Sequence, residues 1–247
     1  MSTALPPTAP PDRHDAVTWG ADPYADALRS GRGPLFLRRS DGWLLPLEVE
    51  RWCAGADTAD LSALRRCEGA VLDIGCGPGR LVAALAAQGR RALGIDVSAA
   101  AVARTAATGG SALHRSVFDS LPHEGGWDTA LLLDGNIGIG GDPCALLARS
   151  AELVSRQGLL IVETTPEDVD ERVQVRVERG YHPRTGTQRA PGAPFPWARV
   201  GAPALLRHAA TAGWTPVEQW TVTDQTDRIP GAERCFVSLR GRARPTC

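Results

Sequence analysis

The segment of residues 70–80, AVLDIGCGPGR, constrains the fold of this chain more than any other stretch. Its apolar start at residues 70–74 predicts a short buried parallel strand. Three alternating glycines follow: Gly75, Gly77 and Gly79. They predict a tight turn whose backbone a ligand can approach closely. The apolar residues 81–88 then predict a helix that ends at Gly89. A strand, a glycine turn and a helix in this order form the nucleotide-binding corner of a doubly wound α/β sheet.

The glycine spacing separates two kinds of nucleotide ligand. A dinucleotide fingerprint, G-x-G-x-x-G, that starts at Gly75 requires a glycine at position 80, where this chain has Arg80. Asp73, at the end of the strand, suits a ligand with an ammonium group and disfavours a pyrophosphate, because like charges repel in a low-dielectric site. The pattern hhDhGxGxG resembles the first motif of class I S-adenosylmethionine (SAM) methyltransferases. The resemblance covers residues 68 to about 165 well and the C-terminal part by topology only.

The order of predicted strands leads to the same fold class. Strands are predicted at 70–74, 91–95, 111–117, 127–133, 158–163, 215–223 and 235–240. Helices are predicted between the earlier ones, at 81–88, 98–107, 142–155 and 202–212. The last two strands are joined by a turn and are expected to pair antiparallel. We therefore expect an α/β protein with a doubly wound, seven-stranded, mostly parallel sheet of order 3-2-1-4-5-7-6, which is the sheet of the family it resembles.

The flanking segments predict additions to this sheet. Residues 1–14 are Pro-rich and are expected to be disordered. Residues 15–67 are predicted to form an N-terminal helical cap, in which residues 34–47 are a possible hairpin. The SAM-binding methyltransferase domain is then expected over 68–247. It contains an insertion at 169–200, where valines alternate with polar residues as in a half-exposed strand, and this insertion is predicted to be a β-hairpin flap.

Polar residues at the predicted strand ends are the candidates for binding the cofactor. Asp96 ends the second strand, about 20 residues after the glycine turn, where a carboxylate can accept both hydroxyls of a ribose. The resemblance implies that Asp119 binds the adenine amino group and that Val97 and Phe118 cover the faces of the ring. Asp134 and Asn136 end the fourth strand, next to the first, and are expected to face the methionine part of SAM. The full set is Asp73, Gly75, Gly77, Gly79, Asp96, Val97, Phe118, Asp119, Asp134 and Asn136.

Transfer of a methyl group to oxygen or nitrogen can require a base. The candidate catalytic side chains are His182 and Tyr181 in the insertion, His14 near the N-terminus and Asp134. His208 in a helix and His114 in a strand are expected to serve structure. No zinc-type Cys/His spacing, HExxH motif or EF-hand is present in the sequence, so no metal is predicted.

Composition favours a small-molecule acceptor and a cytoplasmic location. The net charge of −1 gives no electrostatic sign of nucleic acid or anionic membrane as a partner. No apolar run approaches the roughly 20 residues of a membrane span. The six cysteines lack CxxC spacing, and reduced thiols are expected. Several aromatic residues are candidates for the walls of an apolar acceptor pocket: Trp19, Tyr24, Trp43, Phe195 and Trp197.

The sequence thus predicts SAM-dependent methyl transfer to an O or N atom, less often C, of a small molecule, as in secondary metabolism. Two alternatives stay open at this stage. A nicotinamide-dependent oxidoreductase is disfavoured by Arg80, and a SAM-binding protein without catalysis has the same ligand residues. The acceptor and the oligomeric state are not predicted.

Overall fold

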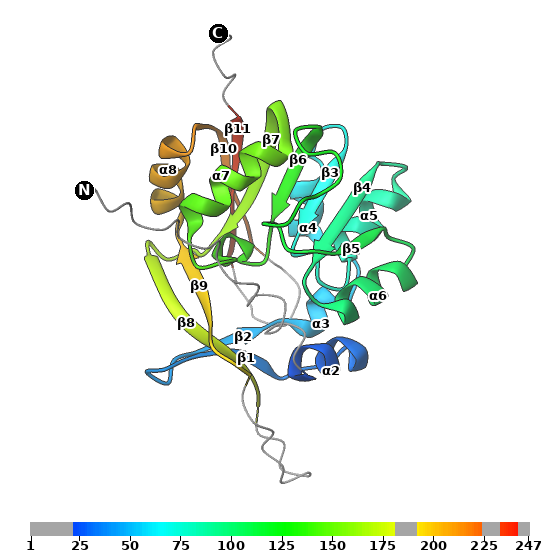
Figure 1. Ribbon diagram of the computed structural model, residues 1–247, viewed down its shortest axis with the longest axis vertical. Coiled ribbons are helices and arrows are strands. Elements are labelled where there is room, and N and C mark those ends of the chain that lie inside the picture. Colours follow the sequence, from blue (N-terminus) through cyan, green and yellow to red (C-terminus); the bar gives the residue numbers. More distant parts are fainter. Residues whose placement is uncertain (1–21, 181–191, 224–232, 242–247) are drawn as a thin grey trace, which may run out of the picture.

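A seven-stranded sheet runs through the centre of the molecule, with helices on both of its faces (Figure 1). The computed structural model describes residues 22–180, 192–223 and 233–241. The strands of this sheet are β3 (Val71–Ile74), β4 (Ala92–Asp96), β5 (Ala112–His114), β6 (Trp127–Leu132), β7 (Val154–Thr164), β10 (Trp214–Thr223) and β11 (Glu233–Gly241). Their spatial order is β10-β11-β7-β6-β3-β4-β5.

This order confirms the predicted sheet, because counting its strands along the chain gives 3-2-1-4-5-7-6. The first five strands are parallel, and β10 and β11 pair antiparallel as expected. Two boundaries differ from the prediction by three residues or more. The third strand ends at His114, because the chain then folds into a turn in which Asp119 accepts the Ser116 N–H at 3.0 Å. The fifth strand begins at Val154, directly after a helix, rather than at Gly158.

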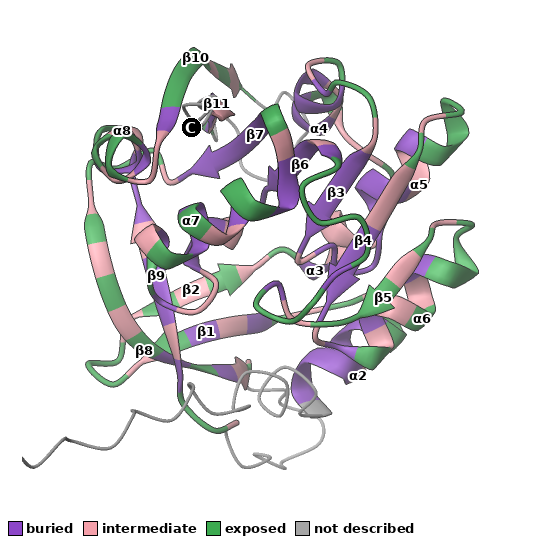
Figure 2. Ribbon diagram, turned by 45° about the horizontal axis from the view of Figure 1, so that its top comes forward, coloured by how far each residue is buried: buried purple, intermediate pink, exposed green. Residues whose placement is uncertain are grey.

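Alternating side chains of the buried strands face two separate layers of helices. On β6, Ala130 and Leu132 belong to the core under one pair of helices, whereas Leu131 belongs to the core under the other pair. The first pair is α7 (Pro143–Leu153) and α8 (Ala202–Thr211), and the second is α4 (Thr58–Leu64) and α5 (Arg80–Ala87). Helix α6 (Ala99–Ala107) packs against β4 and β5, and a 3-10 turn, η1 (Asn136–Gly138), follows β6. Figure 2 shows that β3 and β6 are buried, while β10 is exposed along most of its length.

The helix starts follow the capping residues in the sequence. Asp142 accepts the backbone N–H groups of Cys144 and Ala145, and Pro143 occupies the first helical position of α7. Ser98 accepts the N–H of Ala101 at the start of α6. These side chains satisfy N–H groups that the helix leaves without a partner, so the α7 and α6 starts are fixed locally.

A second, four-stranded antiparallel sheet lies across one end of the first and is called the cap sheet here. Its order is β2-β1-β8-β9, and its strands are β1 (Leu35–Arg39), β2 (Leu44–Leu47), β8 (Asp170–Arg179) and β9 (Phe195–Val200). The hairpin flap predicted from the valine alternation is β8 and β9, and the possible hairpin at 34–47 is β1 and β2. The pairing of β1 with β8, which joins Leu35 to Arg179, unites the two hairpins.

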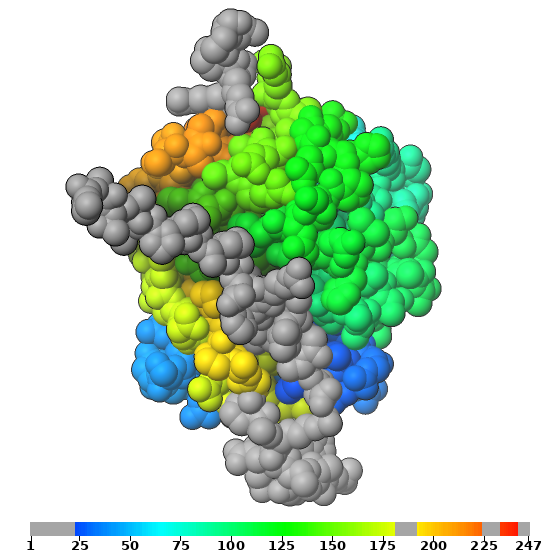
Figure 3. Space-filling view, viewed as in Figure 1, coloured from blue at the N-terminus to red at the C-terminus, as the bar shows by residue number. Residues whose placement is uncertain are grey.

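Helices complete the cap. Helix α2 (Asp22–Ser30) packs Tyr24 and Leu28 against the apolar face of the cap sheet, and α3 (Val49–Trp52) leads back toward the core. Figure 3 shows the described N-terminal part (blue) and strands β8 and β9 (yellow) at the same end of the molecule. None of the helices within the described ranges combines the length and the apolar character that crossing a membrane requires.

Candidate active site

A pocket with an empty volume of about 970 Å³, partly open to solvent, lies between the central sheet and the cap. The carboxyl ends of β3, β4 and β6 form one side of it. Residues from this side include Gly75, Gly77, Asp96, Val97, Asp134 and Asn136. The opposite side is largely apolar and includes Tyr24, Leu37, Leu47, Trp52, Phe195 and Trp197. The position is the one where open α/β sheets bind ligands, beyond the carboxyl ends of the strands at a switch in strand order.

The glycine turn after β3 leaves its backbone open to this pocket. Gly77 has a φ of +54°, and among the described residues a Cβ atom built there would meet only the Tyr24 hydroxyl, at 3.6 Å. A Cβ atom at Gly75 would instead meet the Asn136 side chain at 2.7 Å. The Asn136 amide donates hydrogen bonds of 2.9 Å to the carbonyls of Ile74 and Gly75. Asn136 therefore holds the turn in place, and Gly77 offers a free approach to its backbone.

Asp96 is fixed at the end of β4 by two backbone N–H groups. Its Oδ2 accepts from Gly77 at 2.9 Å, and its Oδ1 accepts from Ser98 at 2.8 Å. Burial raises the pKa of Asp96 to about 6, although these hydrogen bonds act in the opposite direction. Each carboxylate oxygen has more than one lone pair, so both can accept a further hydrogen bond. The arrangement fits two hydroxyl donors in the pocket.

Asp73 lies in β3, two residues before the pocket-lining Gly75, and is 1 % exposed. Its Oδ2 has no hydrogen-bond partner among the described residues. Burial raises the pKa of Asp73 to about 7, and the charge of Arg80 limits the rise. A buried acid with an unpaired oxygen is costly in an empty site. Asp73 is not itself among the pocket-lining residues, but the charge of an ammonium group beside the glycine turn would reduce that cost. In this respect the residues present fit an aminoacyl ligand.

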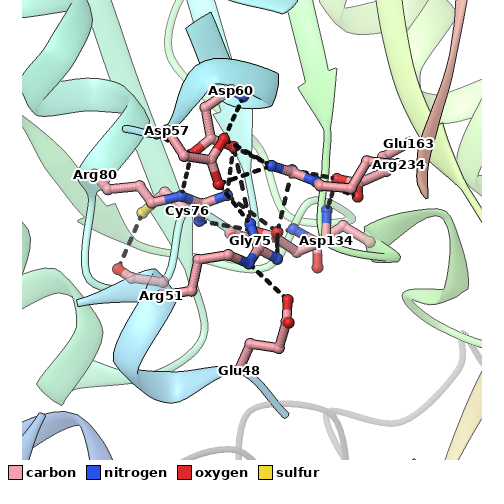
Figure 4. A network of polar contacts seen from close by, with 12 residues as sticks. Glu48, Arg51, Asp57, Asp60, Gly75, Cys76, Arg80, Asp134, Glu163 and Arg234 are labelled. Carbon is pink, nitrogen blue, oxygen red and sulfur yellow. Dashed lines mark hydrogen bonds and ion pairs between the residues drawn. The ribbon is translucent and has the colours of Figure 1, made fainter. Parts of the chain in front are cut away.

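Asp134 ends β6 in the pocket wall, but its carboxylate is held by arginines (Figure 4). Its Oδ1 accepts from Arg51 Nη2 at 2.6 Å, and its Oδ2 accepts from Arg80 Nη1 at 2.7 Å. Burial by itself would raise the pKa of Asp134, but the charges of Arg80, Arg51 and Arg234 outweigh it and hold the pKa well below its usual range. A carboxylate in this state is a poor proton acceptor, which does not favour the catalytic role expected for Asp134.

The same contacts belong to a larger buried network, called the arginine cluster here. Its members are Arg51, Arg80, Arg234, Asp57, Asp60, Asp134 and Glu163. Arg80 also donates to both oxygens of Asp60, at 2.7 and 2.8 Å. Arg234 donates to both oxygens of Glu163, at 2.8 Å each. Arg80 thus has a structural task at the position where a dinucleotide fingerprint has its third glycine. The other members of the arginine cluster are far apart in the sequence, and no sequence motif indicated that they would meet.

The remaining predicted residues fall into two groups. Val97 lines the pocket, whereas Phe118 and Asp119 are not among its lining residues. Phe118 is 43 % exposed, and Asp119 accepts from the Ser116 N–H in a turn. The Arg199 guanidinium lies over the Trp43 ring, 4.8 Å from the ring centre. Trp43 is also not among the pocket-lining residues. The predicted base residues His182 and Tyr181, and likewise His14 and Trp19, lie outside the described residues.

No cluster of metal-ligating side chains occurs in the part of the chain that the structure describes.

Comparison with known families then decides what kind of protein carries this pocket. A family model described as a methyltransferase domain matches residues 49–198, which is more than half of the 247 residues. The chain belongs to this methyltransferase family. Its fold and family make it a class I SAM-dependent methyltransferase, with S-adenosylmethionine as the cofactor.

Solved structures of methyltransferases share the fold over most of their length. A SAM-dependent methyltransferase from Bacteroides fragilis, in complex with S-adenosyl-L-homocysteine, has a TM-score of 0.66 and 19% identity, with 88% of this chain and 92% of that chain covered. The CcbJ methyltransferase from Streptomyces caelestis has a TM-score of 0.60 and 19% identity, with 94% and 100% covered.

A third structure is the 1,6-didemethyltoxoflavin-N1-methyltransferase from Burkholderia thailandensis, which has a TM-score of 0.59 and 19% identity, with 97% of this chain and 93% of that chain covered. No curated protein matches this methyltransferase in sequence. At these identities the structures establish a common fold, and the residues of the site must be argued from this chain itself.

Proposed function

We propose that this methyltransferase transfers the methyl group of SAM to an O or N atom of a small molecule that binds against the cap sheet. One observation carries the proposal: a single pocket has the glycine turn and Asp96 on one side and apolar cap side chains on the other. The two reactants of a methyl transfer can therefore meet in it. A neighbour of the same fold, the Burkholderia N1-methyltransferase, was crystallised with such a small molecule and S-adenosylhomocysteine.

On the cofactor side, each proposed role follows from the contacts. Asp96 accepts the two ribose hydroxyls with the lone pairs that its backbone donors leave free. Gly77 allows the cofactor to contact the backbone of the turn, and Val97 covers the adenine ring. Asp73 provides the negative charge that attracts the ammonium group. Asn136 does not need to touch the cofactor, because its hydrogen bonds to Ile74 and Gly75 already explain its place.

On the acceptor side, the cap supplies shape and exclusion of water. SAM supplies a methyl group that is already activated by the sulfonium charge. The protein then has to hold the nucleophilic atom in line with the methyl–sulfur bond, and such positioning can contribute roughly 7 to 11 kcal/mol. Leu37 comes from β1 and Trp197 from β9, which lie on either side of β8 in the cap sheet. The bridge between Ile139 and Trp197 attaches β9 to the loop after β6.

Proton removal from the acceptor is a separate requirement. Burial raises the pKa of Tyr24, so its hydroxyl stays protonated at neutral pH, and Asp134 is held as an anion of low basicity. His182 and Tyr181 are the base candidates that the sequence offers, and His182→Ala and Tyr181→Phe test them. A true base accounts for roughly 10² to 10⁴ in rate. If a variant keeps turnover within about twofold, the residue that it replaces is not the base.

The experiment that tests the function uses two measurements. Calorimetry should show binding of SAM and of S-adenosylhomocysteine, and no binding of NADH. A panel of apolar amines, phenols and alcohols should then contain an acceptor that releases S-adenosylhomocysteine. Binding of NADH in place of SAM would overturn the assignment. SAM binding with no turnover on acceptors of any class would reduce the protein to a SAM-binding module.

A further inference from the structure

Three polar side chains from three different elements form a chain of hydrogen bonds between α7, α8 and β8. Cys144 Sγ on α7 lies 3.2 Å from Nδ1 of His208 on α8. The other ring nitrogen, Nε2 of His208, lies 3.0 Å from both carboxylate oxygens of Asp170, which is the first residue of β8. None of the three lines the pocket. Figure 1 shows α7 and α8 next to each other on the outer face of the central sheet.

The direction of the proton in this chain follows from the donors and acceptors. An ionised carboxylate can only accept a hydrogen bond, and the hydrogen bond from His208 lowers the pKa of Asp170. Nε2 of His208 therefore carries the proton that faces Asp170. Nδ1 of the neutral ring is then left as an acceptor, directed at the Cys144 thiol. A thiol, a base within reach and a third group that orients the base are the arrangement that activates a nucleophile.

The surroundings of Cys144 support the same chemistry. Cys144 is the second residue of α7, a helix of 11 residues, so the positive end of the helix dipole lies at the sulfur. Arg172 and Arg207 lie 3.7 and 3.9 Å from Asp170. Asp142, the N-cap residue of α7, accepts the Cys144 backbone N–H at 3.0 Å through its Oδ1. Cys144 is half-buried, so small reagents can reach it.

We propose that Cys144 is a nucleophilic thiol and a covalent modification site for soft electrophiles, with His208 as its base and Asp170 as a positioning residue. With an α-iodoamide, the thiol proton passes to Nδ1 of His208 and the sulfur attacks the carbon that bears iodine. A sulfur–carbon bond forms, the carbon–iodine bond breaks with its electron pair, and iodide leaves. No oxidant or reductant takes part in this step.

The other cysteines provide the comparison. Burial raises the pKa of Cys67 to about 12 and also raises the pKa of Cys76, which makes both inert as nucleophiles. Cys235 is half-buried like Cys144, but the hydrogen-bonding partner of its sulfur among the described residues is a hydroxyl, that of Thr221, at 3.7 Å. Cys235 is therefore the matched internal control for accessibility without a base.

The test is alkylation of the full chain by iodoacetamide at pH 7, followed by mass spectrometry of the cysteine peptides. We expect Cys144 to react at least about tenfold faster than Cys235. His208→Gln should lower the Cys144 rate at least about fivefold, and Asp170→Asn should lower it less. Asp170→Glu should restore most of the rate. Thr211→Ala, at an exposed position of α8 away from the Cys144–His208–Asp170 contacts, should leave the rate within about twofold.

Equal rates for Cys144 and Cys235 in the unmodified protein would overturn the proposal without any variant. So would a normal Cys144 rate in folded His208→Gln, which would leave His208 as a packing residue. Folding is monitored by circular dichroism and by SAM affinity, which should not change. If His208→Gln fails to fold, the Asp170→Asn and Asp170→Glu pair decides, because a residue that only packs has no reason to distinguish amide from carboxylate in this rate.

Discussion

The two aspartates at the glycine turn differ in how their charges are satisfied. Asp96 has a backbone N–H for each oxygen, whereas Asp73 has an oxygen without a partner in the described structure. Both are buried, and burial raises the pKa of each, to about 6 and about 7. A site built in this way is electrostatically incomplete until a cation-bearing ligand enters. The consequence can be measured on the protein without any acceptor.

Asp73→Asn should stabilise the ligand-free protein at high pH. The folded pKa of about 7 lies above the ordinary value of 3.8, so the protonated acid favours the folded state. That contribution is complete below about pH 4 and is lost as the pH rises through about 7. Asparagine carries no charge to bury. Urea unfolding should therefore show a gain of about 1 to 4 kcal/mol at pH 8 and little gain at pH 4.5. Calorimetry should show SAM binding at least about tenfold weaker. A gain that is equal at both pH values would contradict the role of the buried charge.

Gly77→Val should abolish SAM binding in a folded protein. The new side chain would project from a backbone with φ of +54° into space that, within the described part of the chain, only the Tyr24 hydroxyl approaches. Backbone strain alone costs about 1 to 2 kcal/mol, so the control is Gly89→Val, whose site has φ of +70° and no atom within 4 Å. Both variants should lose similar stability, and only Gly77→Val should lose SAM affinity, by at least about 100-fold. Equal affinity in the two variants would show that the cofactor does not approach this turn.

Local patterns predicted the elements well, because each depends on neighbours in the chain. The sequence indicated the glycine turn, the helix starts at Asp142 and Ser98, and the valine alternation of β8. The pairing of β1 with β8 could not be predicted, because pairing between strands so far apart in the sequence produces no periodic pattern of residues. For the same reason, the Cys144–His208 contact was not predictable, and His208 was expected to serve structure alone.

The hairpin of β1 and β2 should determine how well the acceptor binds. Leu47 lines the pocket, whereas Leu44 on the same strand is 46% exposed and points away from it. Leu47→Ala removes apolar contact with the acceptor, so its KM should rise roughly tenfold, equivalent to about 1.4 kcal/mol. SAM affinity should stay within about twofold. Leu44→Ala should change neither value. If SAM affinity falls and KM does not, the hairpin belongs to the cofactor side.

The arginine cluster connects parts of the molecule that no single motif joins. Arg51 comes from α3 in the cap, Arg80 from the start of α5 and Arg234 from β11. Their carboxylate partners come from α4 and its N-cap and from the ends of β6 and β7. Four carboxylates face three arginines, so removal of one cation raises the excess of negative charge in the cluster from one to two. The network therefore makes the stability of the cap and of the central sheet interdependent.

Arg234→Met should destabilise the whole protein by about 3 to 5 kcal/mol at pH 7, because Glu163 loses both of its hydrogen bonds from this guanidinium. The double variant Arg234→Met, Glu163→Gln should recover part of this loss. The control is Arg240→Met on the same strand, whose exposed ion pair with Glu68 should cost less than about 1 kcal/mol. Urea unfolding measures all three. Equal losses for Arg234→Met and Arg240→Met would show that the buried network contributes no more than a surface pair.

The cap sheet combines strands that are far apart in the sequence, and this restricts the order in which parts of the protein can fold during synthesis on the ribosome. Strands β1 and β2 emerge early, but a lone two-stranded hairpin is marginally stable in water. Their partner β8 follows only after the strands from β3 to β7 have been made. During this interval the hairpin of β1 and β2 has no partner strand. When β1 finally pairs with β8, the chain between them contains the nucleotide-binding half of the domain. The cap sheet is thus completed only after the strands that carry the glycine turn and Asp96 have been made. A nascent chain stalled before β8 would carry the glycine turn without Phe195 and Trp197 on the opposite side of its pocket.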